Sequence, residues 1–282
     1  MEISHGKFWQ TSRFRIDLNT PCVMGIVNVT PDSFSDGGQF FNSAAALAHC
    51  EALLSDGAHI LDIGAESSRP GAAAVGWQEE WKRVQPVLSG ALSLGCPVSL
   101  DTTKTELMRR ALDLGVDIVN DINALQADGA LAAVAAHADC GVCLMHMQGE
   151  PQSMQTAPHY TDVIEEVSQF LARRLTALTS KNVARQRIVL DPGIGFGKTV
   201  AHNLELLRQQ AGLLVLGQPL LVGWSRKSTL GVVIGEANGD RLVASVAAAL
   251  ASVQNGASIV RVHDVAATVD ALKVWKAAGL TA

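Results

Sequence analysis

The sequence predicts a (β/α)8 TIM barrel, an α/β fold in which residues 1–282 form a single domain with a short N-terminal hairpin. Short apolar runs alternate with helix-like segments along the chain, and eight such runs can be counted, as this barrel requires. The length of 282 residues suits the fold, because such barrels commonly use about 250 residues as one domain. Most runs end in polar or charged residues, so one pattern predicts both the fold and the candidate site.

The expected elements follow in chain order. Alternating segments around residues 7–18 predict a small hairpin or cap over the barrel floor. The apolar runs that we expect to become strands cover residues 23–28, 59–62, 97–101, 117–120, 142–146, 187–191, 219–223 and 258–261. Long insertions follow the first and second runs, and loops of that length are typical of active-site lids.

Local signals predict where helices begin and end between these runs. Thr103-x-x-Glu106 and Asp162-x-x-Glu165 are capping-box patterns that would open helices. Apolar residues between 163 and 178 recur with the 3.6-residue period of a helix. Glycines that would end a helix before the next strand stand at Gly57, Gly115 and Gly256.

The composition argues against several classes of function. Net charge is −5, so the chain lacks the basic footprint of a nucleic-acid-binding protein. No apolar run reaches the about 18 residues that a membrane span needs, and we expect no secretory signal. The odd count of five cysteines predicts reduced thiols and a cytoplasmic location. We therefore expect small-molecule substrates rather than nucleic acid or membrane partners.

The residues that end the apolar runs form the candidate site. In a barrel the C-terminal ends of the strands converge on one face, and that face carries the chemistry. A single polar residue at a strand end is as well explained as a turn former or a helix cap. A succession along the whole chain indicates a functional face, and its members are Asn28, Asp62, Asp101, Asn120, Asp121, His146, Asp191, Ser225, Arg226, Lys227, Arg261 and His263.

Cations at the last two strand ends predict an anion site. Arg226 and Lys227 stand where a strand ends and a helix begins, a position that favours anions over cations. The Arg261–His263 segment repeats the arrangement after the eighth run, and barrels often bind phosphate at these two strands. Together with Arg69, these residues predict a site for phosphate or diphosphate.

Acidic and amide groups end four other runs, at Asp62, Asp101, Asn120 and Asp191. Such groups suit a ring with amidine-like N–H edges, such as a pterin, because they pair with several donors at once. Paired acids for metal-assisted or acid–base chemistry are the competing interpretation. Spacing alone does not choose between the two.

The glycine-rich segment 191–198 is not a nucleotide-binding motif. A Walker A loop would need glycine where Pro192 stands, and the dinucleotide pattern would need a third glycine where Lys198 stands. We expect the glycines instead to let the backbone approach a flat ligand, with Phe196 beside it.

We expect no zinc or redox site. Cys140 and Cys143 form a lone C-x-x-C pattern whose spacing along a strand places the sulfurs on opposite faces. The histidines show neither an H-E-x-x-H pattern nor a close pair. A hard cation held mainly by ligand phosphates and one protein oxygen, such as that of Asn28, would leave only a faint trace in the sequence.

Taken together, these motifs resemble the dihydropteroate synthase family from about residue 20 to residue 279. The resemblance rests on eight ordered stretches: MGIVNVTPDSFSDGG at 24, DIGAESSRPGA at 62, VSLDTTK at 98, VNDI at 119, LMHMQG at 144, DPGIGFGK at 191, SRKS at 225 and RVHDV at 261.

The resemblance implies the condensation of 6-hydroxymethyl-7,8-dihydropterin diphosphate with 4-aminobenzoate in folate biosynthesis, the step that sulfonamides inhibit. It implies a homodimer and Mg²⁺ on Asn28. The pterin would bind to Asp101, Asn120, Asp191 and Lys227. The diphosphate would bind to Asn28, Ser68, Arg69, Arg261 and His263. The 4-aminobenzoate pocket would be lined by Phe34, Pro70, Phe196 and Ser228, and the catalytic residues would be Asp101, Lys227, Arg261 and His263.

Two rival functions and three departures accompany the resemblance. Methyltetrahydrofolate-dependent methyltransferases are similar barrels, but they would not need the Phe34 loop or the Arg261 and His263 anion site. A catalytically silent pterin-binding protein would be expected to lose Arg69, Lys227 or Arg261, which are all present. The departures from the family pattern are Ala65, Ser68 and Trp224, and they bear on loop packing rather than on the reaction.

Overall fold

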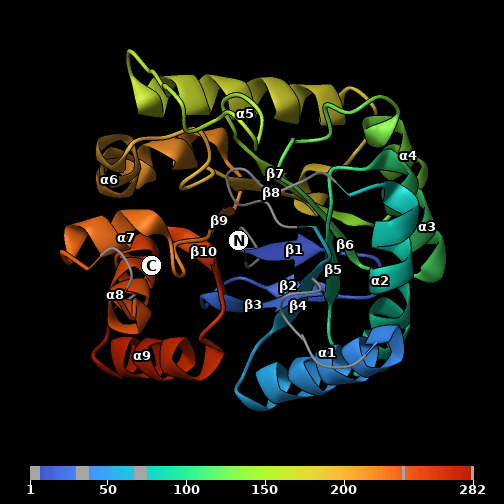
Figure 1. Cartoon of the computed structure of the whole chain (residues 1–282). Helices are drawn as coiled ribbons and strands as arrows, with labels where there is room; N and C mark the ends of the chain where they lie inside the picture. Colours follow the sequence, from blue (N-terminus) through green and yellow to red (C-terminus); the bar gives the residue numbers. More distant parts are fainter. Residues whose placement is uncertain (1–6, 30–37, 67–74, 237–238, 281–282) are drawn as a thin grey trace, which may run out of the picture.

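The protein forms a closed barrel of eight parallel strands, which confirms the predicted fold (Figure 1). The computed structural model describes residues 7–29, 38–66, 75–236 and 239–280. The strands pair in the order β10-β3-β4-β5-β6-β7-β8-β9. They are β3 (Cys22–Asn28), β4 (Ile60–Gly64), β5 (Val98–Asp101), β6 (Ile118–Asp121), β7 (Gly141–Met145), β8 (Ile188–Asp191), β9 (Leu220–Val222) and β10 (Ala257–Val262).

Helices surround the barrel on its outer side (Figure 1). They are α1 (Gly38–Ser55), α2 (Trp77–Ala91), α3 (Thr105–Leu114), α4 (Ala130–Ala136), α5 (Val163–Thr179), α6 (Val200–Gln209), α7 (Ser228–Val233), α8 (Leu242–Gln254) and α9 (Val265–Ala277), with 3-10 segments η2 (Arg185–Arg187) and η3 (Gln210–Leu216). In the described part of the chain, none of these helices has the length and apolar character needed to cross a bilayer.

Inward-facing side chains change from apolar at the barrel floor to polar at the rim. Met24, Ile60 and Ile118 belong to one buried apolar cluster inside the barrel. Two residues after Ile60 and Ile118, the same strand faces present Asp62 and Asn120, because side chains alternate between the two faces of a strand. The residues between them point outward and pack against the helices, as Leu61 does in the cluster that contains residues of α2. The polar residues therefore rest on an apolar floor.

The N-terminal hairpin closes that floor, as the sequence predicted. Strands β1 (Phe8–Gln10) and β2 (Arg15–Asp17) pair antiparallel. Trp9 is fully buried in the interior cluster, and its Nε1 donates to the carbonyl oxygen of Arg187 at 2.8 Å. Gly141 makes room for the hairpin, because a side chain there would lie 2.9 Å from Thr11 Cγ2 and 3.2 Å from Trp9 Nε1.

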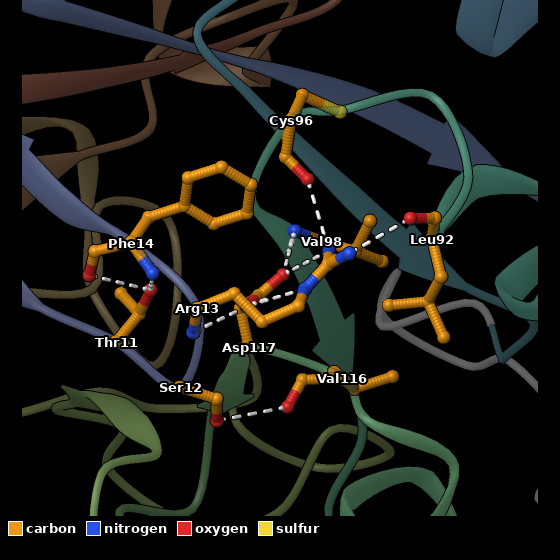
Figure 2. Close-up of polar contacts among 9 residues, drawn as sticks. All are labelled: Thr11, Ser12, Arg13, Phe14, Leu92, Cys96, Val98, Val116 and Asp117. Atoms are coloured by element: carbon orange, nitrogen blue, oxygen red, sulfur yellow. Dashed lines mark hydrogen bonds and ion pairs between the residues drawn. The ribbon is translucent and has the colours of Figure 1, made fainter.

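An ion pair fastens the hairpin to the barrel, and Figure 2 shows its contacts. The guanidinium of Arg13 donates to both carboxylate oxygens of Asp117, at 2.9 and 2.6 Å, and to the carbonyl oxygens of Leu92 and Cys96. Asp117 is fully buried, and it also accepts the backbone N–H of Val98 at 2.9 Å. The hairpin turn is thus bound to the segments that begin β5 and β6.

The helix signals were only partly right. Asp162 caps α5 by accepting the N–H of Glu165 at 3.0 Å, which confirms that prediction, although Glu166 rather than Glu165 reaches back to the N–H of Asp162. The capping box at Thr103 is wrong. Helix α3 begins at Thr105 with Lys104 at its N-cap, and no side chain caps it.

The hairpin ion pair generates a stability prediction. Arg13→Ala should lower the free energy of unfolding by about 2–4 kcal/mol, because it leaves the buried Asp117 carboxylate without its cation. The effect should fall short of a fully buried pair, since the Arg13 side chain is 35% exposed. Urea unfolding monitored by circular dichroism measures it.

The matched control is Arg15→Ala in the same hairpin. Arg15 is exposed and lies 3.7 Å from the centroid of the Phe8 ring. Its removal should cost less than about 1 kcal/mol. Equal losses for the two variants would show that the Asp117 contact does not anchor the hairpin.

Candidate active site

The centre of the rim is a partly buried cation shared by two carboxylates. Arg261, on β10, donates through Nε to Asp62 Oδ2 at 2.6 Å and through Nη2 to Asp101 Oδ2 at 2.8 Å. Asn120, on β6, donates through Nδ2 to the same Asp62 oxygen at 3.1 Å. The structure therefore brings together four side chains that the sequence placed at the ends of β4, β5, β6 and β10.

Burial and charge set the protonation of this group. Burial raises the pKa of Asp101 to about 7, against the opposing effect of Arg261, and the neighbouring charge of Asp62 raises it further. Burial alone would lower the pKa of Arg261, but the carboxylates of Asp62 and Asp101 raise it above its ordinary value. The guanidinium therefore stays charged. Asp62 Oδ1 is buried and has no hydrogen-bond partner among the described residues, so it can accept a donor from a ligand.

A second acid lies at the end of β8. Asp191 is buried, and its Oδ1 accepts the N–H of Gly193 at 2.7 Å. Burial raises its pKa to about 6, although the Gly193 N–H and the charge of Lys227 oppose the shift. Lys227 lies with its Nζ 4.2 Å from the centroid of the Phe196 ring. Burial, together with the charge of Arg261, lowers the pKa of Lys227 to about 8.

His263 is held as a neutral ring. Ser225 Oγ lies 3.0 Å from His263 Nδ1 and accepts the backbone N–H of His263 at 3.1 Å. Burial and the charges of Arg226 and Arg261 lower the pKa of His263 to about 4. With Oγ donating to Nδ1, the remaining proton is assigned to Nε2, so His263 can offer a neutral N–H to an anion.

Arg226 does not belong to this group, although its position had suggested an anion site. Its guanidinium makes two bonds to Asp264, at 2.6 and 3.1 Å, and its side chain is 57% exposed. Ser228, by contrast, is the first residue of α7 and is exposed beside Lys227.

Several predicted residues lie outside this central group. Asn28 is exposed at the end of β3. Asp121 binds the backbone N–H groups of Asn123 and Leu125, both at 2.7 Å, so it shapes a loop. The remaining residues, which stay predictions because they lie outside the described part of the chain, are Phe34, Ser68, Arg69 and Pro70.

The structure places the predicted Phe196 in an apolar wall whose other members the sequence analysis missed. Ile122, Met145, Met154 and Phe196 form a buried cluster against which Met147 packs. The signal was available for Met145, because it stands two residues after Cys143 and so shares its inward strand face. An apolar wall beside acids and cations suits a flat heterocycle.

The cysteines and two of the family departures are buried among apolar side chains. Cys140 packs in the helix-side cluster and Cys143 inside the barrel, which confirms their opposite faces, and all five cysteines are free. Ala65 and Trp224 are buried in the outer clusters, so these departures affect packing. The described residues contain no group of three or more His, Cys, Asp or Glu that could hold a metal ion.

Comparisons with known proteins agree with this geometry. A family model described as "Pterin binding enzyme" matches residues 24–263. The chain is 55% identical over 278 residues to dihydropteroate synthase of Neisseria meningitidis serogroup B, covering 96% of this chain and 98% of that protein.

Two solved structures are also similar. One is Xanthomonas albilineans dihydropteroate synthase with 4-aminobenzoic acid (TM-score 0.91, 46% identity, covering 98% of this chain and 100% of that chain). The other is Burkholderia cenocepacia dihydropteroate synthase complexed with 7,8-dihydropteroate (TM-score 0.87, 44% identity, covering 97% of each chain).

The central ion group generates a pH-dependent prediction. Arg261→Met leaves two carboxylates without their cation and should lower the free energy of unfolding by about 3–5 kcal/mol at pH 8. A carboxyl whose folded pKa is raised, as that of Asp101 is, favours folding when protonated, and this contribution is lost as pH rises from about 4 to about 7. Removing the cation strengthens that trend, so the deficit should shrink toward pH 5.

Thermal melts of both proteins at pH 5 and pH 8 measure the effect. A gap in Tm that is the same at both pH values would show that the guanidinium does not favour the charged form of Asp101. Arg226→Met is the matched control. The Arg226 side chain is 57% exposed, so solvent screens its pair with Asp264, and the deficit should be small and less dependent on pH.

Proposed function

Because the chain belongs to the dihydropteroate synthase family of pterin-binding enzymes, we propose that its rim residues divide the recognition and the chemistry of that reaction between two sides of the barrel. The enzyme is a transferase. It transfers the pterin-methylene group of 6-hydroxymethyl-7,8-dihydropterin diphosphate to 4-aminobenzoate, giving 7,8-dihydropteroate and pyrophosphate.

The observation that carries the assignment is the polar layer over the apolar floor. Asp62, Asp101 and Asp191 are acceptors for the N–H groups of a pterin, and Asn120 and Lys227 can donate to its ring oxygen and nitrogens. Asp62 Oδ1 is an acceptor that the described residues leave without a donor. The Phe196 wall supplies apolar contact with the ring. A phosphate site alone would not need these acids.

The cations would stabilise the leaving group. Arg261 uses Nε and Nη2 for its carboxylates, and its Nη1 makes no hydrogen bond with the described residues, so it can donate to a phosphate oxygen. The His263 N–H can donate to the same anion. Charge builds on the departing pyrophosphate in the transition state, where preoriented donors contribute most. The opposite charge builds on the pterin methylene, which Asp101 would offset.

The amine requires less help from the protein. The nitrogen of 4-aminobenzoate attacks the methylene carbon, the C–O bond to the diphosphate breaks, and the nitrogen then loses a proton. An aryl ammonium is acidic, so this proton can pass to water or to the pyrophosphate. We therefore assign no general base. We propose that Phe34, Pro70, Phe196 and Ser228 line the amine pocket, with Ser68 and Arg69 on the diphosphate.

We propose Mg²⁺ as the metal, held by the side-chain oxygen of Asn28. Asn28 is exposed at the rim end of β3, and the described residues offer no carboxylate or histidine cage. This donor set suits a hard cation that takes most of its oxygens from phosphate and water. When bound, the ion would neutralise charge on the leaving pyrophosphate.

We propose a homodimer that covers the outer face of α7 and α8. Large apolar side chains are exposed there, with Val232 59%, Val233 55% and Val243 81% accessible. Exposed apolar patches on soluble proteins commonly mark interaction surfaces. The family resemblance supports a second copy of the chain as the partner.

We also propose that the hairpin and barrel form one domain, since Trp9 is packed inside the barrel. A cytoplasmic location is supported by the five free thiols, which a reducing compartment maintains. Sulfonamides would compete with 4-aminobenzoate for its pocket.

Pyrophosphate release tests the reaction. Purified protein with Mg²⁺ and the pterin diphosphate should release pyrophosphate rapidly only when 4-aminobenzoate is added. Pyrophosphate release at the same rate without 4-aminobenzoate would indicate a hydrolase. No release under either condition would indicate a catalytically silent binding protein.

Neighbouring variants provide a matched control for that assay. Lys227→Met should reduce the rate strongly, while Arg226→Gln, which loses only the surface pair with Asp264, should stay within about threefold of the parent.

The pH profile tests the protonation states. Pterin recognition needs Asp191 ionised and Lys227 protonated, and Asp101 must be ionised to offset charge on the methylene. The value of kcat/KM should therefore rise between about pH 6 and about pH 7 and fall through about pH 8. Lys227→Arg keeps its charge at every pH in this range, so the alkaline limb should disappear even if the rate is lower. An unchanged alkaline limb in this variant would assign it to another group.

A further inference from the structure

Lys198 is a buried lysine whose three donors are all used inside the protein. Its side chain lies in the loop between β8 and α6, and the residue is 2% exposed. Its Nζ lies 2.9 Å from His146 Nδ1, 2.9 Å from the carbonyl oxygen of Gly193 and 3.0 Å from that of Phe196. An ammonium has three protons to donate, so these three acceptors saturate it.

Two of these acceptors belong to the loop that carries ligand-facing groups. Gly193 donates its N–H to Asp191, and Phe196 carries the ring beneath Lys227. The loop has little regular structure of its own. Gly193, Gly195 and Gly197 have φ values of +70°, +81° and +61°, and one turn bond joins the Phe196 N–H to the Gly193 carbonyl oxygen. Such a loop needs outside contacts to keep one conformation.

His146 completes the support from β7. Burial and the charge of Lys198 lower the pKa of His146 to about 2, so its ring stays neutral and Nδ1 can accept. The ring stacks edge-on against Phe170 at 4.9 Å. A side chain on Gly193 would lie 1.8 Å from the carbonyl oxygen of His146, so the two loops touch at this point. Tyr160 holds the C-terminal end of the 192–197 loop, because its hydroxyl donates to the carbonyl oxygen of Gly197 at 2.8 Å.

A packing role alone does not account for a charged group here. Burial lowers the pKa of Lys198 to about 7, although the charge of Asp191 opposes the shift, and Lys198 makes no salt bridge with a carboxylate of the described residues. Its donors are all taken, so it is not placed to contact substrate. Its charge does act on Asp191, whose ionised form it favours. Lys198 therefore affects Asp191 in two ways. It holds the backbone of Gly193, which donates to Asp191, and its positive charge favours the ionised form of Asp191.

We propose that Lys198 is a positioning residue, which holds the 192–197 loop so that Asp191 and Phe196 present a fixed binding surface to the pterin. This inference rests on the proposed function. It assigns a purpose to a lysine whose donors are taken inside the protein and which forms no ion pair with an acid of the described residues. It also separates the pterin side of the rim from the diphosphate side, where Arg261 and His263 lie.

Lys198→Met tests this separation, because methionine has a side chain of similar length but lacks the N–H donors of Lys198. The dissociation constant for 7,8-dihydropteroate should rise by about 10-fold to 100-fold, the range seen when a group that orients a binding residue is lost. Affinity for inorganic pyrophosphate with Mg²⁺ should change less than about threefold, because Lys198 does not touch Arg261 or His263. Calorimetric titration measures both.

A double-mutant cycle tests the link to Asp191. If Lys198 acts through Asp191, then Lys198→Met should weaken dihydropteroate binding much less in an Asp191→Asn background than in the parent. In the matched cycle, which combines Lys198→Met with Asn28→Ala at the end of β3, the two effects on dihydropteroate binding should be additive. Arg13→Ala controls for lost stability, since it loosens the opposite end of the barrel and should leave both affinities unchanged.

The outcomes separate the inference from the function on which it rests. A parent protein that binds no dihydropteroate refutes the proposed function. A parent that binds it, with unchanged affinity in Lys198→Met, refutes the positioning role. Equal losses for dihydropteroate and pyrophosphate, or additive effects with Asp191→Asn, would reduce Lys198 to a structural residue. Should Lys198→Met not fold, Lys198→Gln, which keeps two donors without the charge, is measured by the same criteria.

Discussion

The site depends on one partly buried guanidinium. Arg261 is the cation that allows Asp62 and Asp101 to remain close together on an apolar floor, because the two carboxylates would repel each other without it. With Asp191 on the other side and Lys227 as the second cation, the ligand-free site has more acids than bases. Such a site favours a ring rich in N–H donors, and an acceptor on Asp62 lies buried without a partner among the described residues.

The barrel makes this arrangement possible because it fixes the distances between the charged side chains and also keeps water away from them. Parallel strands bring residues from distant parts of the chain to one rim, as the contact between Arg261 and Asp62 shows over 199 residues. The hairpin fills the opposite end with Trp9, so water does not reach the charges from below. Interactions between charges are stronger when water is excluded, and the structure combines this with side chains held on strands rather than on loops.

The sequence predicted the strands and the rim because both follow from local pattern. Apolar runs with polar ends specify which residues reach the rim of a barrel, and Asp62, Asp101, Asn120, Asp191 and Arg261 lie there. Pairing across the barrel is not local, and the pattern does not encode it. Arg226 and Lys227 are neighbours of like charge, yet the exposed Arg226 is paired with Asp264 and Lys227 faces Phe196. The Thr103 capping box failed for a related reason. Lys104, one residue later, is bound to Glu66 and the buried Glu80, and α3 begins only after it.

The sharing of Arg261 also bears on turnover. A bare cation would bind the diphosphate of the substrate and the free pyrophosphate equally tightly, and such uniform binding would slow product release without lowering the barrier. A guanidinium already held by two carboxylates attracts a resting anion less strongly, because much of its charge is compensated. Its attraction matters most when new negative charge appears as the C–O bond breaks. We propose that the two carboxylates also fix the orientation of the Arg261 guanidinium, so that its remaining donor is in place when charge develops on the departing pyrophosphate.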